Sequence, residues 1–98
     1  MRVSQHFSFP RVNVIESDSG YRVEVLGRTG LRYTEGDRTM VIDSEILASV
    51  AGMSLWQSSI ERWEAPNNSV PIDEGERQRV VENIRAAFEA KGYELDVI

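Results

Sequence analysis

The sequence predicts an α+β fold: a mainly antiparallel β-sheet meander packed against one long C-terminal amphipathic helix, with a final short strand. Three observations favour this class. Apolar and polar residues alternate in several segments between residues 11 and 43, and turn residues separate these segments. A helical apolar pattern then covers residues 73–91. A period of two is typical of a half-buried strand, and a period of 3.6 is typical of a helix packed on one side.

The length of 98 residues favours one domain. We expect an N-terminal arm over residues 1–10, ended by Pro10, and a single α+β domain over residues 11–98. Within the arm, Phe7 and Phe9 either cap the edge of the core or belong to a partly disordered segment. The N-terminus lacks the apolar stretch of a signal peptide, so we expect a cytoplasmic protein.

The first half of the domain is expected to form a meander. Its predicted strands are residues 11–16, 21–25, 31–34 and 38–43. The second shows the clearest alternation, with Tyr21, Val23 and Val25 directed to one face. Turn sequences rich in Gly, Ser and Asp lie between the strands, which suits antiparallel neighbours joined by short connections.

The middle of the chain is less regular. Residues 44–50 fit either a single helical turn capped by Ser44 or a continuation of the strand into a sheet edge. Residues 53–56 and 59–63 are expected to form a second hairpin around a turn at residues 57–58. Residues 65–70 are expected to form a loop, because they contain one proline and two consecutive asparagines.

The C-terminal helix has the clearest start and stop signals. Asp73 is a suitable N-cap with Glu76 three residues later, Lys91 lies in the last turn, and Gly92 follows as the expected C-terminal cap. The apolar stripe consists of Val80, Val81, Ile84, Ala87 and Phe88. Residues 93–97 alternate again and predict a final strand.

Composition excludes several functions. There is no cysteine and only one histidine, so a disulfide framework, a thiolate metal site and a multi-histidine site are excluded. The formal net charge is −5, which argues against nucleic acid and anionic membranes as partners. Residues 50–98 carry 5 basic and 9 acidic side chains, so most of the excess negative charge lies in the second half. We predict no catalytic, cofactor or metal residues.

Two features are considered as chemical sites. His6 has no acidic residue near it in sequence, so we expect a solvated side chain. Asp43 and Glu45 are two residues apart and would share one face of a strand. They fit either a cation or acid–base site or an ordinary solvated strand end.

Five residues are candidates for contact with a protein partner: Glu61, Trp63, Glu64, Glu82 and Glu89. Trp63 is either a core residue packed under the helix or a surface aromatic flanked by two acids, and Trp56 raises the same question. The glutamates are chosen because acidic surfaces steer association with basic partners.

The order of these segments resembles the immunity protein 74 family of bacterial polymorphic toxin systems. The resemblance covers residues 21–98, and its most specific parts are the Ser-Glu-Ile-Leu step at residues 44–47 and the Ile-x-x-Trp-x-x-Pro spacing at residues 60–66. The residues that match the family pattern are Glu45, Leu47, Ile60, Trp63, Pro66 and Arg77.

The resemblance implies a non-enzymatic cytoplasmic protein that binds and neutralises a cognate toxin by occlusion. Its partner would be a protein, for which the acidic surface favours a basic toxin. The alternative is a generic interaction or structural module without a toxin partner, which an exposed sheet edge would allow to form a homodimer. A small enzyme using Asp43 and Glu45 is the third interpretation.

Overall fold

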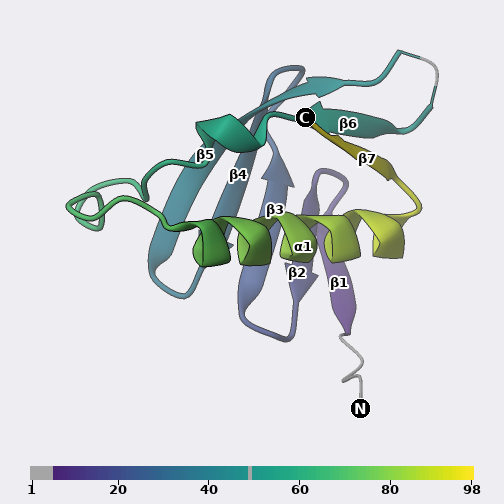
Figure 1. Cartoon of the computed structure of the whole chain (residues 1–98). Helices are drawn as coiled ribbons and strands as arrows, with labels where there is room; N and C mark the ends of the chain where they lie inside the picture. The colour runs from purple at the N-terminus through teal and green to yellow at the C-terminus, as the bar shows by residue number, and fades with distance from the viewer. Residues whose placement is uncertain (1–5, 49) are drawn as a thin grey trace.

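The computed structural model describes residues 6–48 and 50–98, which form one curled sheet and one long helix (Figure 1). The strands are β1 (Phe7–Arg11), β2 (Val14–Ser17), β3 (Tyr21–Val25), β4 (Gly30–Glu35), β5 (Arg38–Ile46), β6 (Gly52–Leu55) and β7 (Glu94–Val97). The helices are the short 3₁₀ helix η1 (Gln57–Ser59) and α1 (Glu74–Lys91). The expected α+β fold is confirmed.

The seven strands lie in the sheet in their order along the chain. All neighbours are antiparallel except β6 and β7, which are parallel. β6 and β7 can be parallel because α1 lies between them in sequence and carries the chain from the end of β6 back to the level at which β6 begins. The meander is therefore extended by one helical crossover.

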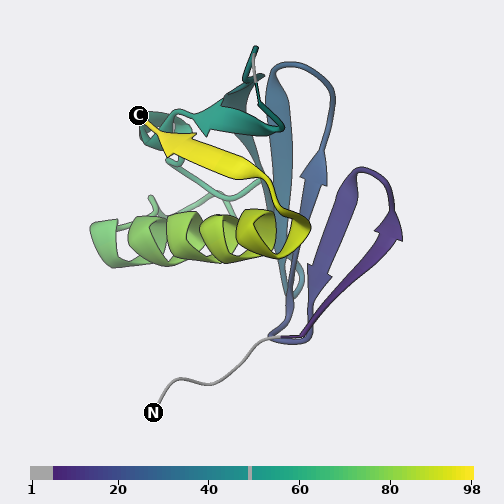
Figure 2. The same cartoon turned by 90° about the vertical axis from the view of Figure 1, so that its right-hand side faces the viewer.

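β5 joins the two parts of the curled sheet. Residues 38–43 pair with β4, whereas residues 44–46 pair with β6. In Figures 1 and 2, β1 to β4 stand on one side of α1, and β6 and β7 reach over it. Residues 44–46 thus continue the strand, which is one of the two alternatives that the sequence allows. They pair with β6 and therefore do not form an edge of the sheet.

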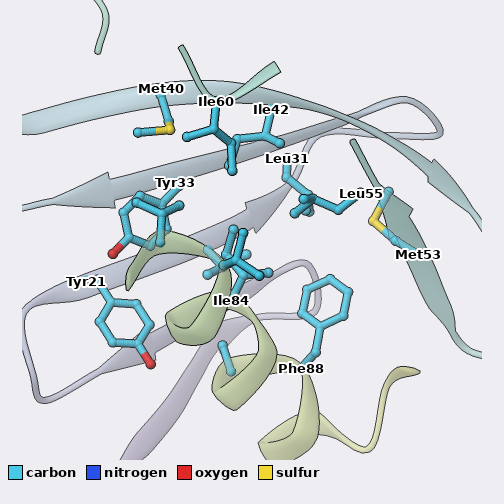
Figure 3. Packing of buried hydrophobic residues seen from close by; sticks show 14 of the residues in the cluster. Tyr21, Leu31, Tyr33, Met40, Ile42, Met53, Leu55, Ile60, Ile84 and Phe88 are labelled. Atoms are coloured by element: carbon cyan, nitrogen blue, oxygen red, sulfur yellow. The ribbon is translucent and has the colours of Figure 1, made fainter. Parts of the chain in front are cut away.

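The core lies between the sheet and α1, where the alternating strand residues meet the helix stripe (Figure 3). Tyr33, Leu31 and Phe88 are among its largest fully buried side chains. The predicted stripe of α1 is confirmed, since its buried residues are Val80, Val81, Ile84, Ala87 and Phe88. Burial of these two apolar patterns against each other is the main source of stability.

The ends of α1 follow the predicted signals. The Asp73 carboxylate accepts a hydrogen bond from the Glu76 backbone N–H at 2.8 Å. At the other end, Gly92 adopts a left-handed conformation with φ 79°, and its N–H reaches the last turn of the helix. The sharp reversal at Gly92 allows β7 to begin two residues later.

The second hairpin is a wrong prediction. Residues 53–55 belong to β6, but residues 57–59 form η1 and residues 60–73 contain no strand. Ile60 and Trp63 are both buried, although residues three apart on a regular strand point to opposite faces. The backbone of this segment instead makes isolated hydrogen bonds. The Glu64 N–H donates to the Thr39 carbonyl, and the Ile72 N–H donates to the Glu61 carbonyl. The loop expected at residues 65–70 is confirmed.

The N-terminal residues differ from the expectation as well. Residues 7–10, which were expected in the arm, form most of the edge strand β1, and the strand expected over residues 11–16 is β2 after a turn at residues 12–13. Phe7 packs edge-to-face against Tyr21, with ring centroids 6.4 Å apart. The first five residues of the arm, and residue 49 of the segment 44–50, lie outside the described residues. Within the described ranges, no helix has both the length and the apolar character needed to cross a bilayer.

Candidate partner-binding surfaces

The four glutamates predicted to contact a partner are all exposed. Glu61 and Glu64 lie in the segment between η1 and α1, whereas Glu82 and Glu89 lie seven residues apart on α1 and so share one face of it. Within the described residues, none of these carboxylates takes part in an ion pair or a side-chain hydrogen bond. They are therefore solvated charges that a partner can reach without breaking an internal contact.

The structure separates these glutamates into two pairs. Glu61 lies beside the first turn of α1, because the Arg77 guanidinium donates to the neighbouring Ile60 carbonyl at 3.3 Å. Glu89 is twelve residues further along α1, which corresponds to about 18 Å at the usual helical rise. All four glutamates lie in the acidic second half of the sequence, but only Glu82 and Glu89 share one face of a helix.

Trp63 belongs to the core, and only 4% of it is exposed. Its ring lies 6.1 Å from the Tyr33 ring, and the Arg38 guanidinium covers it at 4.5 Å from the ring centroid. Its indole N–H is 3.5 Å from a Glu76 carboxylate oxygen. The interpretation of a packed core tryptophan is confirmed and that of a surface aromatic is wrong, whereas Trp56 is half-buried.

Next to Trp63 lies a polar network that the sequence did not reveal. The Tyr33 hydroxyl donates to Glu35 at 2.7 Å, and the Asn83 amide donates to the same hydroxyl at 2.8 Å. Arg79 makes two hydrogen bonds to the Glu35 carboxylate, at 2.7 and 3.3 Å, and Arg38 adds a third at 3.1 Å. Glu35 thus connects β4 and β5 to α1. Arg79 is 44 residues away from it, so no local pattern could have indicated the pair.

The pKa shifts in this network favour the charged forms of Glu35 and Arg79. Burial alone would raise the pKa of Glu35, but the hydrogen bonds from Arg79 and Tyr33 and the charges of Arg79 and Arg38 outweigh it and lower that pKa. Burial raises the pKa of Tyr33. The hydrogen bond to Glu35 raises the pKa of Arg79. The shifts of Glu35 and Arg79 favour their charged forms and that of Tyr33 its neutral form, as expected for a fixed ion-pair cluster.

The two carboxylates considered as a chemical site are solvated. Asp43 and Glu45 lie on the exposed face of β5, and Ser44 between them is buried, with its hydroxyl lacking a hydrogen-bond partner among the described residues. No group of three acidic or histidine side chains that could hold a metal ion occurs within residues 6–48 and 50–98. His6 is exposed, and its backbone N–H donates to Asp18 at 3.1 Å.

One apolar cavity of about 300 Å³ lies between the β1–β2 turn and the start of β6. Its lining consists of Val12, Asn13, Ile15, Val25, Ile46, Ala51, Gly52, Met53 and Tyr93. Tyr93 is the one ionisable side chain in this lining, so the cavity suits an apolar group and offers no acid–base pair.

The comparisons agree with the resemblance read from residues 21–98. No curated protein and no solved structure matches the chain. A family model described as immunity protein 74 matches residues 22–98, which include nearly all of the sheet from β3 onwards and the whole of α1. The chain therefore belongs to the immunity protein 74 family.

Proposed function

We propose that this chain binds a cognate polymorphic toxin in the cytoplasm of the cell that makes it, and that it neutralises the toxin by covering its active site or substrate path. Membership of the immunity protein 74 family carries this proposal. The expected mechanism is stoichiometric, with one bound chain inactivating one toxin molecule.

The surface charge supports a basic toxin. The net charge is −5, and Glu61, Glu64, Glu82 and Glu89 have no internal charge partner within the described residues. Complementary surface charge accelerates encounter more than it tightens the final complex. We expect the association rate with the toxin to fall steeply as salt is added.

The proposal is of a binding protein and not of an enzyme. Glu35, the carboxylate with the most contacts, is held ionised by two arginines. Asp43 and Glu45 are solvated on the outer face of β5. The apolar cavity brings no acid–base pair to a substrate.

The direct test uses the purified product of the adjacent upstream gene as the candidate toxin. Titration with the wild-type chain is expected to abolish toxin activity at one equivalent, and co-expression is expected to protect sensitive cells. The double variant Glu82→Lys/Glu89→Lys should slow association, and Asp43→Lys/Glu45→Lys is a matched control because it makes the same charge change on another face.

The outcomes separate the two main interpretations. If the wild-type chain neither binds this toxin nor reduces its activity, the proposal fails and an interaction module without a toxin partner is favoured. If the chain binds but both double variants slow association equally, net charge and not the α1 surface accounts for the steering.

A further inference from the structure

β7 has an edge that the described residues leave open. In its pairing with β6, the Glu94 N–H donates to the Ala51 carbonyl at 2.9 Å and the Ile98 N–H donates to the Leu55 carbonyl at 2.8 Å. Because the alternate residues of a strand direct their backbone groups to opposite sides, Leu95 and Val97 turn theirs away from β6. Within the described residues, the one hydrogen bond to these outward groups comes from the Arg85 guanidinium, which lies 3.5 Å from the Leu95 carbonyl oxygen.

The two edges of the sheet are not equivalent. β1, at the other end of the strand order, contains Pro10, which has no N–H, and its pairing shifts register between Ser8 and Arg11. Proline, an irregular register and charged side chains are features by which proteins protect an edge from pairing. β7 has neither a proline nor a register shift, and the charges of its own side chains, Glu94 and Asp96, are both acidic, so they repel acidic strands and attract basic ones. It is the edge that can accept another strand.

β7 lies above α1 in Figure 2. Its own charged side chains, Glu94 and Asp96, are both acidic. A surface hollow of about 290 Å³ is lined by Arg85, Glu89, Tyr93, Glu94 and Leu95. Along β7, Glu94 and Asp96 are exposed, whereas Leu95 and Val97 are half-buried against the core. An added strand would therefore meet two carboxylates on its outer face and apolar side chains on its inner face.

We propose that an extended segment of the toxin pairs with β7 as an eighth strand and places basic side chains opposite Glu94 and Asp96. This inference rests on the proposed function and assigns its interface. Backbone hydrogen bonds to Leu95 and Val97 supply the pairing, and alternating basic residues supply the selectivity. The expected toxin segment has Lys or Arg at alternate positions and small or apolar residues between them.

A second copy of this chain fits the same edge poorly. A two-fold antiparallel pairing centred on Leu95 would place Glu94 opposite Asp96 of the second copy, and one centred on Asp96 would place that residue opposite itself. Like charges directly opposite each other destabilise a strand pair. The charge pattern of β7 thus favours a basic foreign strand over self-pairing.

The test changes the edge without changing the pairing to β6. Val97→Pro removes an outward N–H and places a proline ring on the edge, while the β6 hydrogen bonds come from other residues. Val97→Ala is the matched control, because it removes side-chain packing but keeps the N–H. We expect Val97→Pro to weaken binding of the purified product of the adjacent upstream gene about tenfold or more, and Val97→Ala to have a much smaller effect.

A charge variant and an exchange measurement complete the test. Glu94→Lys/Asp96→Lys keeps the backbone intact, so it carries the test if Val97→Pro lowers the melting temperature. It should weaken binding more than Asp43→Lys/Glu45→Lys, which makes the same charge change on the same face of the sheet but two strands away from the edge, since Glu45 pairs with Ser54 and Ser54 with Asp96. In the wild-type complex, the amide hydrogens of Leu95 and Val97 should exchange more slowly than in the free chain.

Three other outcomes of these experiments would overturn the inference. Wild-type binding that Val97→Pro and Glu94→Lys/Asp96→Lys leave unchanged would show that the toxin uses another surface, while the proposed function stands. If the wild-type chain does not bind the toxin at all, the proposed function and this interface both fail. Light scattering that shows a dimer of the chain alone, dissolved by Val97→Pro, would assign the edge to self-pairing.

Discussion

Replacement of Trp63 by alanine is the most direct test of how the segment between η1 and α1 contributes to stability. This segment contains no strand or helix from residue 60 to residue 73, and Trp63 is one of its few buried side chains. The substitution removes the ring that lies between Tyr33 and the Arg38 guanidinium. It leaves a cavity beside the polar network of Glu35, so the packing of α1 on the sheet should weaken as well.

The magnitude follows from burial. Trp63 is 4% exposed. A buried tryptophan removes about 200 Å² from water, which at about 25 cal/mol per Å² contributes about 5 kcal/mol as an upper estimate. The hydrogen bond to Glu76 is long at 3.5 Å and adds little. Measured losses for buried aromatic residues replaced by alanine support a destabilisation of about 3–5 kcal/mol.

The assay is urea unfolding followed by circular dichroism in the far ultraviolet, because fluorescence would lose one of its two reporters. At this chain length, a loss of 3 kcal/mol or more corresponds to a fall in the melting temperature of roughly 12 °C or more. Trp56→Ala is the matched control, since Trp56 is only half-buried and should cost clearly less. A change below about 1 kcal/mol for Trp63→Ala would refute the assignment of its ring to the core.

Three further predictions concern the network, the helix start and the β6–β7 contact. Glu35→Gln should be less stable than wild type at neutral pH, because the ionised Glu35 carboxylate stabilises the fold and its pKa is lowered. In urea titrations, the difference in unfolding free energy should shrink as the pH falls below the ordinary carboxyl pKa of 4.5. Asp73→Ala should cost about 1 kcal/mol by removing the N-cap, which thermal unfolding will measure. Gly52→Ala should cost about 1–3 kcal/mol because its added methyl group would collide with the Glu94 backbone, whereas Gly75→Ala, which meets only Asp73 Oδ1 at 3.4 Å, should not destabilise in the same assay.

For Glu35, the opposite pH dependence would contradict the clamp. A lowered folded pKa means that the stabilising contribution is present above the unfolded pKa and is lost as pH falls through the folded one. A Glu35→Gln variant whose deficit persists unchanged at acidic pH would show that packing, and not the ionised carboxylate, accounts for the loss.

Local patterns predicted the regular elements because their physical causes are local. The alternation in residues 21–25 gave β3 with its observed bounds, and the signals at Asp73 and Gly92 gave the ends of α1. In each case, the side chains that favour the element lie within a few residues of the backbone groups that they satisfy or bury.

The second hairpin failed for a different reason. Residues 53–55 do form a strand, but the partner that completes its pairing is β7, which is about 40 residues away and parallel. A search for the nearest suitable strand favours residues 59–63. The tertiary structure instead forms η1 at residues 57–59 and buries both Ile60 and Trp63, which would point to opposite sides of a strand packed on one face only.

The candidate surfaces show the same division. Sequence and charge identified Glu82 and Glu89 as exposed acids, and both are exposed on α1. The sequence did not reveal the clamp at Glu35 or the open edge of β7, because both depend on elements brought together by the tertiary fold.

By itself, the sequence determined the fold class, most of the strands, the limits of α1, the acidic character and the family resemblance, since these depend on periodicity, capping and residue order. The tertiary structure alone decided which tryptophan is buried, which acids are neutralised by arginine and which edge of the sheet is open. The physical reason is that burial, long-range ion pairs and strand order depend on which distant segments meet, and local preference contains no information about those meetings.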